Sequence, residues 1–188
     1  MPQNQKVFIS YAPEDGDRCE PIIRALKDNG FKCWRAPVTV STAPIAPGDA
    51  LSADARRELE QRAVFMRLCT PATQTSSSVQ AEAAGFRQLQ AAERQHGRSD
   101  MRLFVDLILD AAYQPAPGDG ADLTINAAGR PVSAWIVALD QRVGKLKATR
   151  EIDRRMLTAL VTVAVLIGFL LLVYAALHVH TFGIARPR

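Results

Sequence analysis

The apolar residues of this chain fall into short runs and into helically spaced sets, and the two kinds alternate along most of the sequence. The short runs are rich in β-branched and aromatic side chains, and they predict four strands, at residues 6–11, 31–35, 64–70 and 101–109. The helically spaced sets predict four helices, around residues 19–29, 51–59, 79–96 and 136–146. Strands that alternate with helices indicate an α/β fold with a parallel, doubly wound sheet.

Turn residues mark the ends of these elements. Gly30 and Gly97 are expected to end the first and third helices, because glycine readily adopts the left-handed backbone found at helix ends. Pro21 is tolerable if it lies in a first turn. The Ser- and Thr-rich residues 72–78 are predicted to form a polar loop. In a doubly wound sheet the reactive crevice lies beyond the carboxyl ends of the strands, so any site is expected in the loops after residues 11, 35, 70 and 109.

Residues 157–177 form an apolar run without any charged side chain. At about 1.5 Å per helical residue this run would span roughly 30 Å, the thickness of a hydrocarbon core. It therefore predicts a single transmembrane helix. The alternative, a buried core helix, is disfavoured because uncharged runs of this length are rare in small soluble domains.

Basic residues precede the apolar run and set its expected orientation. They are Arg142, Lys145, Lys147, Arg150, Arg154 and Arg155, against only Glu151 and Asp153. Such a cluster favours contact with lipid headgroups and places the larger domain in the cytoplasm. The predicted organisation is a domain at residues 1–148, a basic juxtamembrane linker at 149–156, a transmembrane helix at 157–177 and a short tail at 178–188.

Charge and composition limit the classes of function. The net charge of +4 over 188 residues comes mostly from that cluster, and no domain face carries a mixed basic and aromatic pattern, so no nucleic-acid partner is expected. The three cysteines match no zinc spacing and are expected to be apolar core residues, and the three histidines offer no metal cluster. Arg67 interrupts a strand that should be buried, so it is expected to reach the sheet rim or an acidic partner.

Six short segments share their order and spacing with one known family. The first strand reads Phe8-Ile9-Ser10-Tyr11 and is followed by the acidic pair Glu14-Asp15. The other segments are residues 30–34, the pair Pro47-Gly48, residues 69–71, residues 77–82 and residues 126–135. Together they resemble a bacterial TIR (Toll/interleukin-1 receptor-like) domain over residues 6 to about 148. Several short matches in register are more specific than any one of them.

The resemblance implies a flavodoxin-like fold and a domain that associates with itself or with other TIR domains. The family pairs through its BB loop, represented here by Pro47 and Gly48. Many bacterial members cleave NAD+ at the bond between nicotinamide and ribose, often in defence against phages. NAD+ would then be a substrate, with no cofactor. With the apolar run added, the expected location is the bacterial inner membrane, crossed once, with the TIR domain in the cytoplasm.

Carried over to this sequence, the resemblance assigns the catalytic role to Glu82. It assigns substrate contacts to Phe8, Ser10, Tyr11, Trp34 and Ser78. A carboxylate beside the ribose can stabilise the positive charge that develops as nicotinamide leaves. Glu82 also has a structural interpretation, because an acid in the first turn of a helix interacts favourably with the helix dipole.

Departures from the family pattern leave a second function open. Many active members have Trp four residues before the glutamate, where this chain has Ser78, and an acidic residue after the second-strand Trp, where it has Arg35. A missing aromatic platform would weaken ligand stacking. An NAD+ glycohydrolase activated by assembly at the membrane is slightly favoured. The alternative is a TIR adaptor that recruits other TIR domains without turnover.

Overall fold

The computed structural model describes residues 5–35, 51–98, 101–115 and 120–182. The strands are β1 (Gln5–Ser10), β2 (Phe31–Arg35), β3 (Val64–Cys69), β4 (Leu103–Ile108) and β5 (Leu123–Asn126). The helices are α1 (Gly16–Asp28), α2 (Ala53–Gln61), α3 (Pro71–Thr75), α4 (Ser77–Gln95) and α5 (Val132–Phe182), with a 3-10 turn η1 (Pro13–Asp15) before α1. Strands and helices alternate as predicted as far as β4, which is followed by β5 with no helix among the described residues between them.

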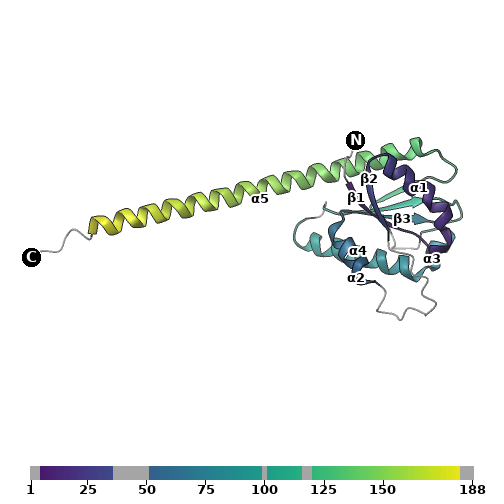
Figure 1. The fold of residues 1–188 in the computed structure, drawn as a ribbon, viewed down its shortest axis with the longest axis horizontal. Helices are drawn as coiled ribbons and strands as arrows, with labels where there is room; N and C mark the ends of the chain where they lie inside the picture. Colours follow the sequence, from purple (N-terminus) through teal and green to yellow (C-terminus); the bar gives the residue numbers. More distant parts are fainter. Residues whose placement is uncertain (1–4, 36–50, 99–100, 116–119, 183–188) are drawn as a thin grey trace, which may run out of the picture. The chain divides into compact units, whose positions relative to one another are not determined.

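The five strands form one parallel sheet in the order β2-β1-β3-β4-β5 (Figure 1). This is the strand order of the flavodoxin-like doubly wound fold, so the predicted fold class is confirmed. The direction of winding reverses between β1 and β3. In sheets of this type, ligands bind outside the carboxyl ends of the strands at that switch point.

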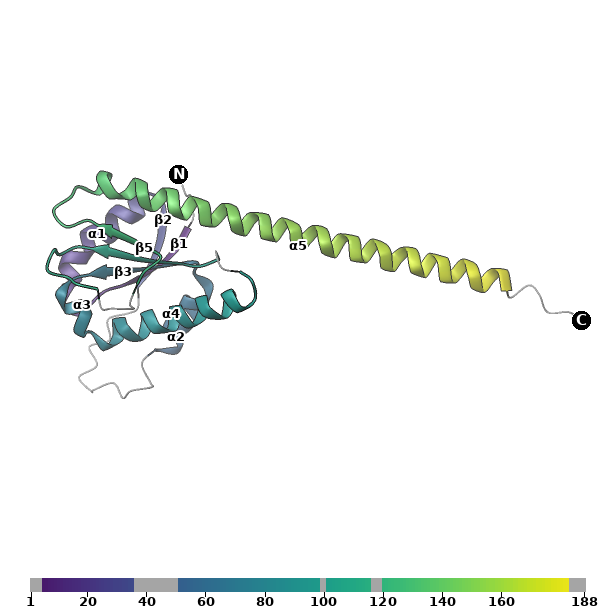
Figure 2. The ribbon, with the colours of Figure 1, turned by 180° about the vertical axis from the view of Figure 1, so that it is seen from behind.

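Helices cover both faces of the sheet (Figures 1 and 2). Helix α1 and the first turns of α5 bury aliphatic side chains and Trp135 against one face, while α2 and α4 cover the other. The second core is smaller and mostly aromatic, and contains Phe8, Phe65, Phe86 and Phe104. Successive side chains of a strand point to opposite faces, so Phe8 enters the aromatic core and Ile9 the aliphatic one.

The predicted polar loop at residues 72–78 is wrong, because helix α3 and the start of α4 lie there. Thr70 is the N-cap of α3: its hydroxyl accepts a hydrogen bond from the Thr73 amide, and the Thr73 hydroxyl accepts one from the Thr70 amide. Pro71 occupies the first helical position, where its missing N–H costs nothing. The hydroxyl side chains around this segment suggest a loop in the sequence, but two of them form the capping box of α3 in the structure.

Two further features differ from expectation. Helix α1 begins at Gly16, before the first apolar position of the helical pattern, so Pro21 lies in its second turn rather than in its first. Strand β5 is missing from the four predicted strands. It is a short edge strand in which only Ile125 is buried, so its sequence carries little apolar signal. Gly30 and Gly97 adopt positive φ angles of 87° and 73° at the ends of α1 and α4, as predicted.

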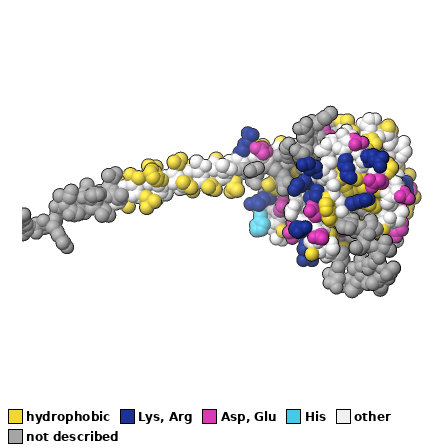
Figure 3. All heavy atoms as spheres, viewed as in Figure 1, with side chains coloured by type: hydrophobic (Ala, Val, Ile, Leu, Met, Phe, Trp, Pro, Cys, Tyr) yellow, Lys and Arg dark blue, Asp and Glu magenta, His cyan; other side chains and the backbone are white. Residues whose placement is uncertain are grey.

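Helix α5 is continuous from Val132 to Phe182, so the predicted linker at residues 149–156 is helical. The chain divides into two compact units, Met1–Lys147 and Ala148–Arg188. In the second unit, Arg155–Ala175 is long and apolar enough to cross a membrane, with a mean hydropathy of 2.8 and no buried residues. Figure 3 shows apolar side chains along this helix.

Candidate functional site

A buried carboxylate and a buried hydroxyl meet at the carboxyl end of β1. Ser10 is the last residue of β1, and Glu82 lies on the face of α4 that packs on the sheet. The Ser10 hydroxyl donates a hydrogen bond of 2.5 Å to Oε2 of Glu82. Only 1% of Ser10 and 7% of Glu82 are exposed. This pair lies at the switch point of the sheet, where the topology predicts a ligand site.

The position of Glu82 along α4 argues against a helix-dipole role. Helix α4 begins at Ser77, so Glu82 is its sixth residue and lies in the second turn, and the first turn contains no acidic residue. The dipole interaction fades within the first turn of a helix. The expectation that Glu82 occupies the first turn is therefore wrong, because Ser77 and Ser78 extend the helix toward its N-terminus.

Burial dominates the electrostatics of Glu82. Removal from water raises the pKa of this carboxyl from its ordinary value of 4.5 to about 7, and the hydrogen bond from Ser10 acts in the opposite direction. No charged side chain contributes to this shift among the described residues. A carboxyl with a pKa near 7 changes charge within the physiological pH range, which is typical of groups at functional sites.

Two of the predicted substrate contacts lie on the same face of the sheet as Ser10. Phe8 is fully buried in the aromatic core, with its ring centroid 5.5 Å from that of Phe65. Trp34 is half-buried at the edge of this core, and its ring lies 4.8 Å from that of Phe8. The structure gives Phe8 a packing role, and its contact with a substrate stays a prediction. Trp34 offers a partly exposed aromatic surface.

Tyr11 is separated from this group. It follows Ser10 in the chain and therefore points to the opposite face, where it joins the aliphatic core. Its hydroxyl accepts a hydrogen bond of 2.7 Å from Arg35, which also pairs with Glu20 at 3.1 Å. Arg35, a departure from the family pattern, thus has a structural role on the Tyr11 side.

Ser78 lies one turn before Glu82 on the same side of α4, as residues four apart on a helix do. It is half-buried, and its hydroxyl lies 3.0 Å from that of Ser76. The side chain that replaces the family's Trp is therefore near the carboxylate. Pro47 and Gly48 lie outside the described residues.

A second buried carboxylate lies two strands away. Asp106 on β4 receives two hydrogen bonds of 2.8 Å from the guanidinium of Arg67 on β3, and the exposed fractions of the two side chains are 2% and 5%. Of the two expectations for Arg67, the sheet rim or an acidic partner, the structure shows the acidic partner. The bidentate geometry and the burial make this a structural ion pair.

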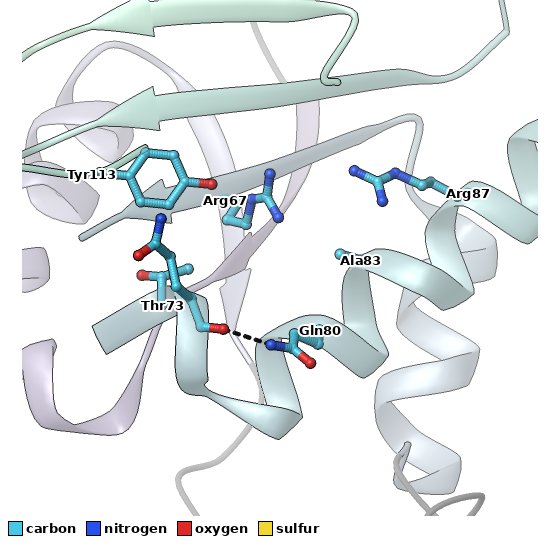
Figure 4. A pocket seen from close by; sticks show the side chains of 7 residues that line it. Arg67, Thr73, Gln80, Ala83, Arg87 and Tyr113 are labelled. Atoms are coloured by element: carbon cyan, nitrogen blue, oxygen red, sulfur yellow. Dashed lines mark hydrogen bonds between the residues drawn. The ribbon is translucent and has the colours of Figure 1, made fainter. Parts of the chain in front are cut away.

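A cavity of about 310 Å³ opens beside α4, next to the Arg67 side chain (Figure 4). It is lined by Arg67, Thr73, Gln74, Gln80, Ala83, Arg87 and Tyr113. Of these residues only Arg67 stands out in the sequence, and the one signal for the others is the helical spacing of positions 80, 83 and 87. Several of the polar groups are already engaged: Gln80 donates to the Gln74 carbonyl, and Thr73 donates to the Leu68 carbonyl. Glu82 does not line this cavity.

The remaining ionisable candidates are structural. Burial raises the pKa of the Cys19 and Cys69 thiols to about 12 and that of Cys33 to about 11, so all three remain protonated and unreactive at neutral pH. The described residues contain no cluster of three or more His, Cys, Asp or Glu that could hold a metal ion. The Ser10–Glu82 pair is therefore the strongest chemical candidate in the described part of the domain.

Comparisons with known proteins identify the family. A family model described as TIR domain matches residues 7–128. No curated protein matches the chain. Among solved structures, the TIR domains of the activated Roq1 resistosome, which directly recognises the pathogen effector XopQ, are 14% identical with a TM-score of 0.43. That match covers 57% of this chain and 58% of the other. On the strength of the family model, this chain belongs to the TIR domain family.

Proposed function

We propose that this protein is a membrane-anchored NAD+ glycohydrolase of the TIR family, with Glu82 as its catalytic residue. The observation that carries the proposal is the Glu82 carboxylate, buried without an ion-pair partner among the described residues and hydrogen-bonded to Ser10 at the switch point of the sheet. Burying a carboxyl costs free energy, so packing alone does not explain an acid at this position.

The proposed reaction breaks the N-glycosidic bond of NAD+. The bonding electron pair stays with the nicotinamide nitrogen, which leaves as a neutral pyridine, so no strong general acid is required. Positive charge develops on the ribose ring, and the Glu82 carboxylate stabilises it. Water then adds to the anomeric carbon and releases a proton, which gives ADP-ribose. Ser78, one turn before Glu82 on α4, and Trp34, on the same face of the sheet as Ser10, would contact the substrate.

Anchoring to a membrane is the second part of the proposal. The described apolar side chains of the second unit are exposed, for example Leu166 at 56%, Leu170 at 65% and Leu172 at 71%. A stretch that is exposed along its whole length and has a mean hydropathy of 2.8 is unfavourable in water, and a bilayer would bury it. We place the chain in the bacterial inner membrane, crossed once, with the TIR domain in the cytoplasm because the basic residues precede the span.

Assembly is the proposed trigger. Domains tethered to one membrane plane reach a high effective concentration, so weak contacts between them become productive. The family resemblance assigns these contacts to the loop that contains Pro47 and Gly48. Deleting these two residues should reduce cross-linking between copies and should lower turnover on liposomes. Unchanged cross-linking would assign self-association to another surface.

The catalytic proposal is tested by Glu82→Gln in the full chain on liposomes with NAD+. The amide keeps the size of the side chain and removes its charge, so nicotinamide release should fall by about a hundredfold or more. Glu60→Gln, at an exposed position of α2, is the matched control and should retain full activity. Turnover that survives Glu82→Gln would contradict the assignment.

The adaptor remains the second candidate, and the replacement of Trp by Ser at position 78 favours it. An adaptor would bind other TIR domains on liposomes and release no nicotinamide at any protein density. Ser78→Trp separates the two functions, because an added aromatic platform should strengthen NAD+ binding only if position 78 borders a working pocket. Absence of turnover in both proteins would leave the adaptor.

The anchor is tested by fractionation of cells that express the full chain. The protein should sediment with membranes and resist extraction by alkaline carbonate, as proteins with a spanning helix do. The matched control replaces Leu166 and Leu170 with Lys, which makes insertion of the helix unfavourable. Recovery of the unmodified chain in the aqueous fraction would contradict the membrane assignment.

A further inference from the structure

We propose that Ser10 is a positioning residue for Glu82: its hydroxyl holds Oε2, favours the charged form of the buried carboxylate and leaves Oε1 for the substrate. The inference rests on the proposed function and deepens it. The family resemblance assigns Ser10 only a substrate contact. The structure instead places its hydroxyl on the carboxylate itself.

The geometry fixes both partners of this hydrogen bond. The backbone of Ser10 is held in the sheet, where it pairs with Arg67 of β3, so its side chain has a defined direction. A serine hydroxyl has one proton to donate, and here Oε2 of Glu82 receives it at 2.5 Å. Short O–H···O contacts of this length are typical when the acceptor is charged. No hydrogen bond from the described residues reaches Oε1.

Ser10 is the sole polar partner of Glu82 among the described residues, and the nearby charges are engaged elsewhere. On β3, Arg67 forms its ion pair with Asp106. On α2, Glu58 pairs with Arg62, while Arg56 and Glu60 line a separate cavity around Gly85. Helix α3 has no titratable side chain, and on α4 Arg87 lies over the Phe104 ring at 4.8 Å. Among the described groups, the Ser10 hydroxyl is thus the one that opposes the rise in the Glu82 pKa caused by burial.

Loss of the Ser10 hydroxyl should change the ionisation of Glu82 in one direction. Without the hydroxyl, burial acts alone, so the Glu82 carboxyl becomes harder to ionise. A neutral acid stabilises a developing positive charge poorly. The acid limb of the pH profile for nicotinamide release should therefore move to higher pH. Alanine has only a slightly lower strand preference than serine, and its side chain fits the same space.

The experiment compares the wild-type full chain with Ser10→Ala, Ser10→Cys and the control Ser77→Ala, an exposed serine at the start of α4. Initial rates of nicotinamide release on liposomes are measured from pH 5 to 8.5. In parallel, the Glu82 carboxyl is titrated by carbon-13 NMR, with its signal assigned by its absence from Glu82→Gln. Ser10→Ala should move both titrations upward by about one pH unit, the size expected for one hydrogen bond to a charged group.

Ser10→Cys keeps the side-chain size with a weaker donor, so it should lie between the wild type and Ser10→Ala, and Ser77→Ala should match the wild type. Unshifted NMR titrations in Ser10→Ala and Ser10→Cys would overturn the inference even if the wild type turns over NAD+. A shifted NMR titration in a protein without turnover supports the role of Ser10 in the ionisation of Glu82 and removes the proposed enzyme. If Ser10→Ala fails to fold, Ser10→Cys decides in the same two assays.

Discussion

The α4 side of the sheet and the β3–β4 strand pair each hold one buried carboxylate, and the two regions treat it differently. Asp106 faces a guanidinium in bidentate geometry, whereas Glu82 faces a single hydroxyl. Both are almost completely removed from solvent. The same desolvation is thus offset by an opposite charge in one region and by one neutral donor in the other.

The difference distinguishes a structural acid from the acid that we propose to be catalytic. The Arg67 guanidinium engages both oxygens of Asp106, so this carboxylate has less to offer a ligand. Glu82 keeps one oxygen without a hydrogen bond from the described residues, and the pKa of its carboxyl is raised to about 7 by burial. Burial is common to both acids, so the proposal for Glu82 depends on the difference between their partners.

The largest effect should come from breaking the ion pair. Asp106→Ala leaves the Arg67 guanidinium buried without its carboxylate, which should lower the free energy of unfolding by about 3–5 kcal/mol. Urea denaturation of the full chain in detergent measures this. The double variant Arg67→Met/Asp106→Leu removes both charges and should regain most of the loss. A double variant as unstable as Asp106→Ala would show that the pair does more than balance its own charges.

The pH dependence of stability should reveal the unpaired acid. The folded-state pKa of Glu82 is raised, from 4.5 to about 7, so between these pH values the folded chain binds more protons than the unfolded chain. The stabilising contribution of protonated Glu82 is complete below pH 4.5 and is lost as pH rises through 7, by about 3 kcal/mol. Glu82→Gln should therefore match the wild type at pH 4.5 and exceed its stability at pH 8. Equal stability at both pH values would show that Glu82 is not desolvated in solution.

The smallest effect is expected at the start of α3, where a third carboxylate accepts a hydrogen bond from a hydroxyl. The Thr70 hydroxyl donates to the half-buried Asp15 and also caps the helix. Thr70→Val keeps the branched shape and removes the cap, which should lower the free energy of unfolding by about 1 kcal/mol. Thr75→Val, at the exposed end of α3, is the control. A loss as large as that of Asp106→Ala would mean that Thr70 has a role beyond capping.

Periodicity along the chain predicts most of this architecture. Alternating strands and helices predict the parallel sheet. An arginine inside a buried strand is expected to reach the sheet rim or an acidic partner, and the structure shows the partner to be Asp106. Strand β5 is not predicted from the sequence, because an edge strand needs few apolar residues. Helix α3 is not predicted either, because the Ser and Thr residues that cap helices are also common in loops.

The candidate site is predictable in its members but not in its contacts. The family resemblance points to both Ser10 and Glu82, yet they are separated by 72 positions in sequence. Their hydrogen bond depends on the register of β1 against β3 and on the rotation of α4, which no local pattern specifies. Local periodicity does specify two other placements: helical spacing puts Ser78 one turn from Glu82, and strand alternation points Tyr11 to the face opposite Ser10.

The placement of the two tryptophans gives each face of the sheet its own fluorescent reporter. Trp34 is half-buried beside the aromatic core, whereas Trp135 is 2% exposed in the aliphatic core. A collisional quencher such as acrylamide should therefore reach the indole of Trp34 and spare that of Trp135. Emission from Trp34 should respond to a nucleotide that enters beside Glu82, while Trp135 reports only on whether the opposite core remains intact.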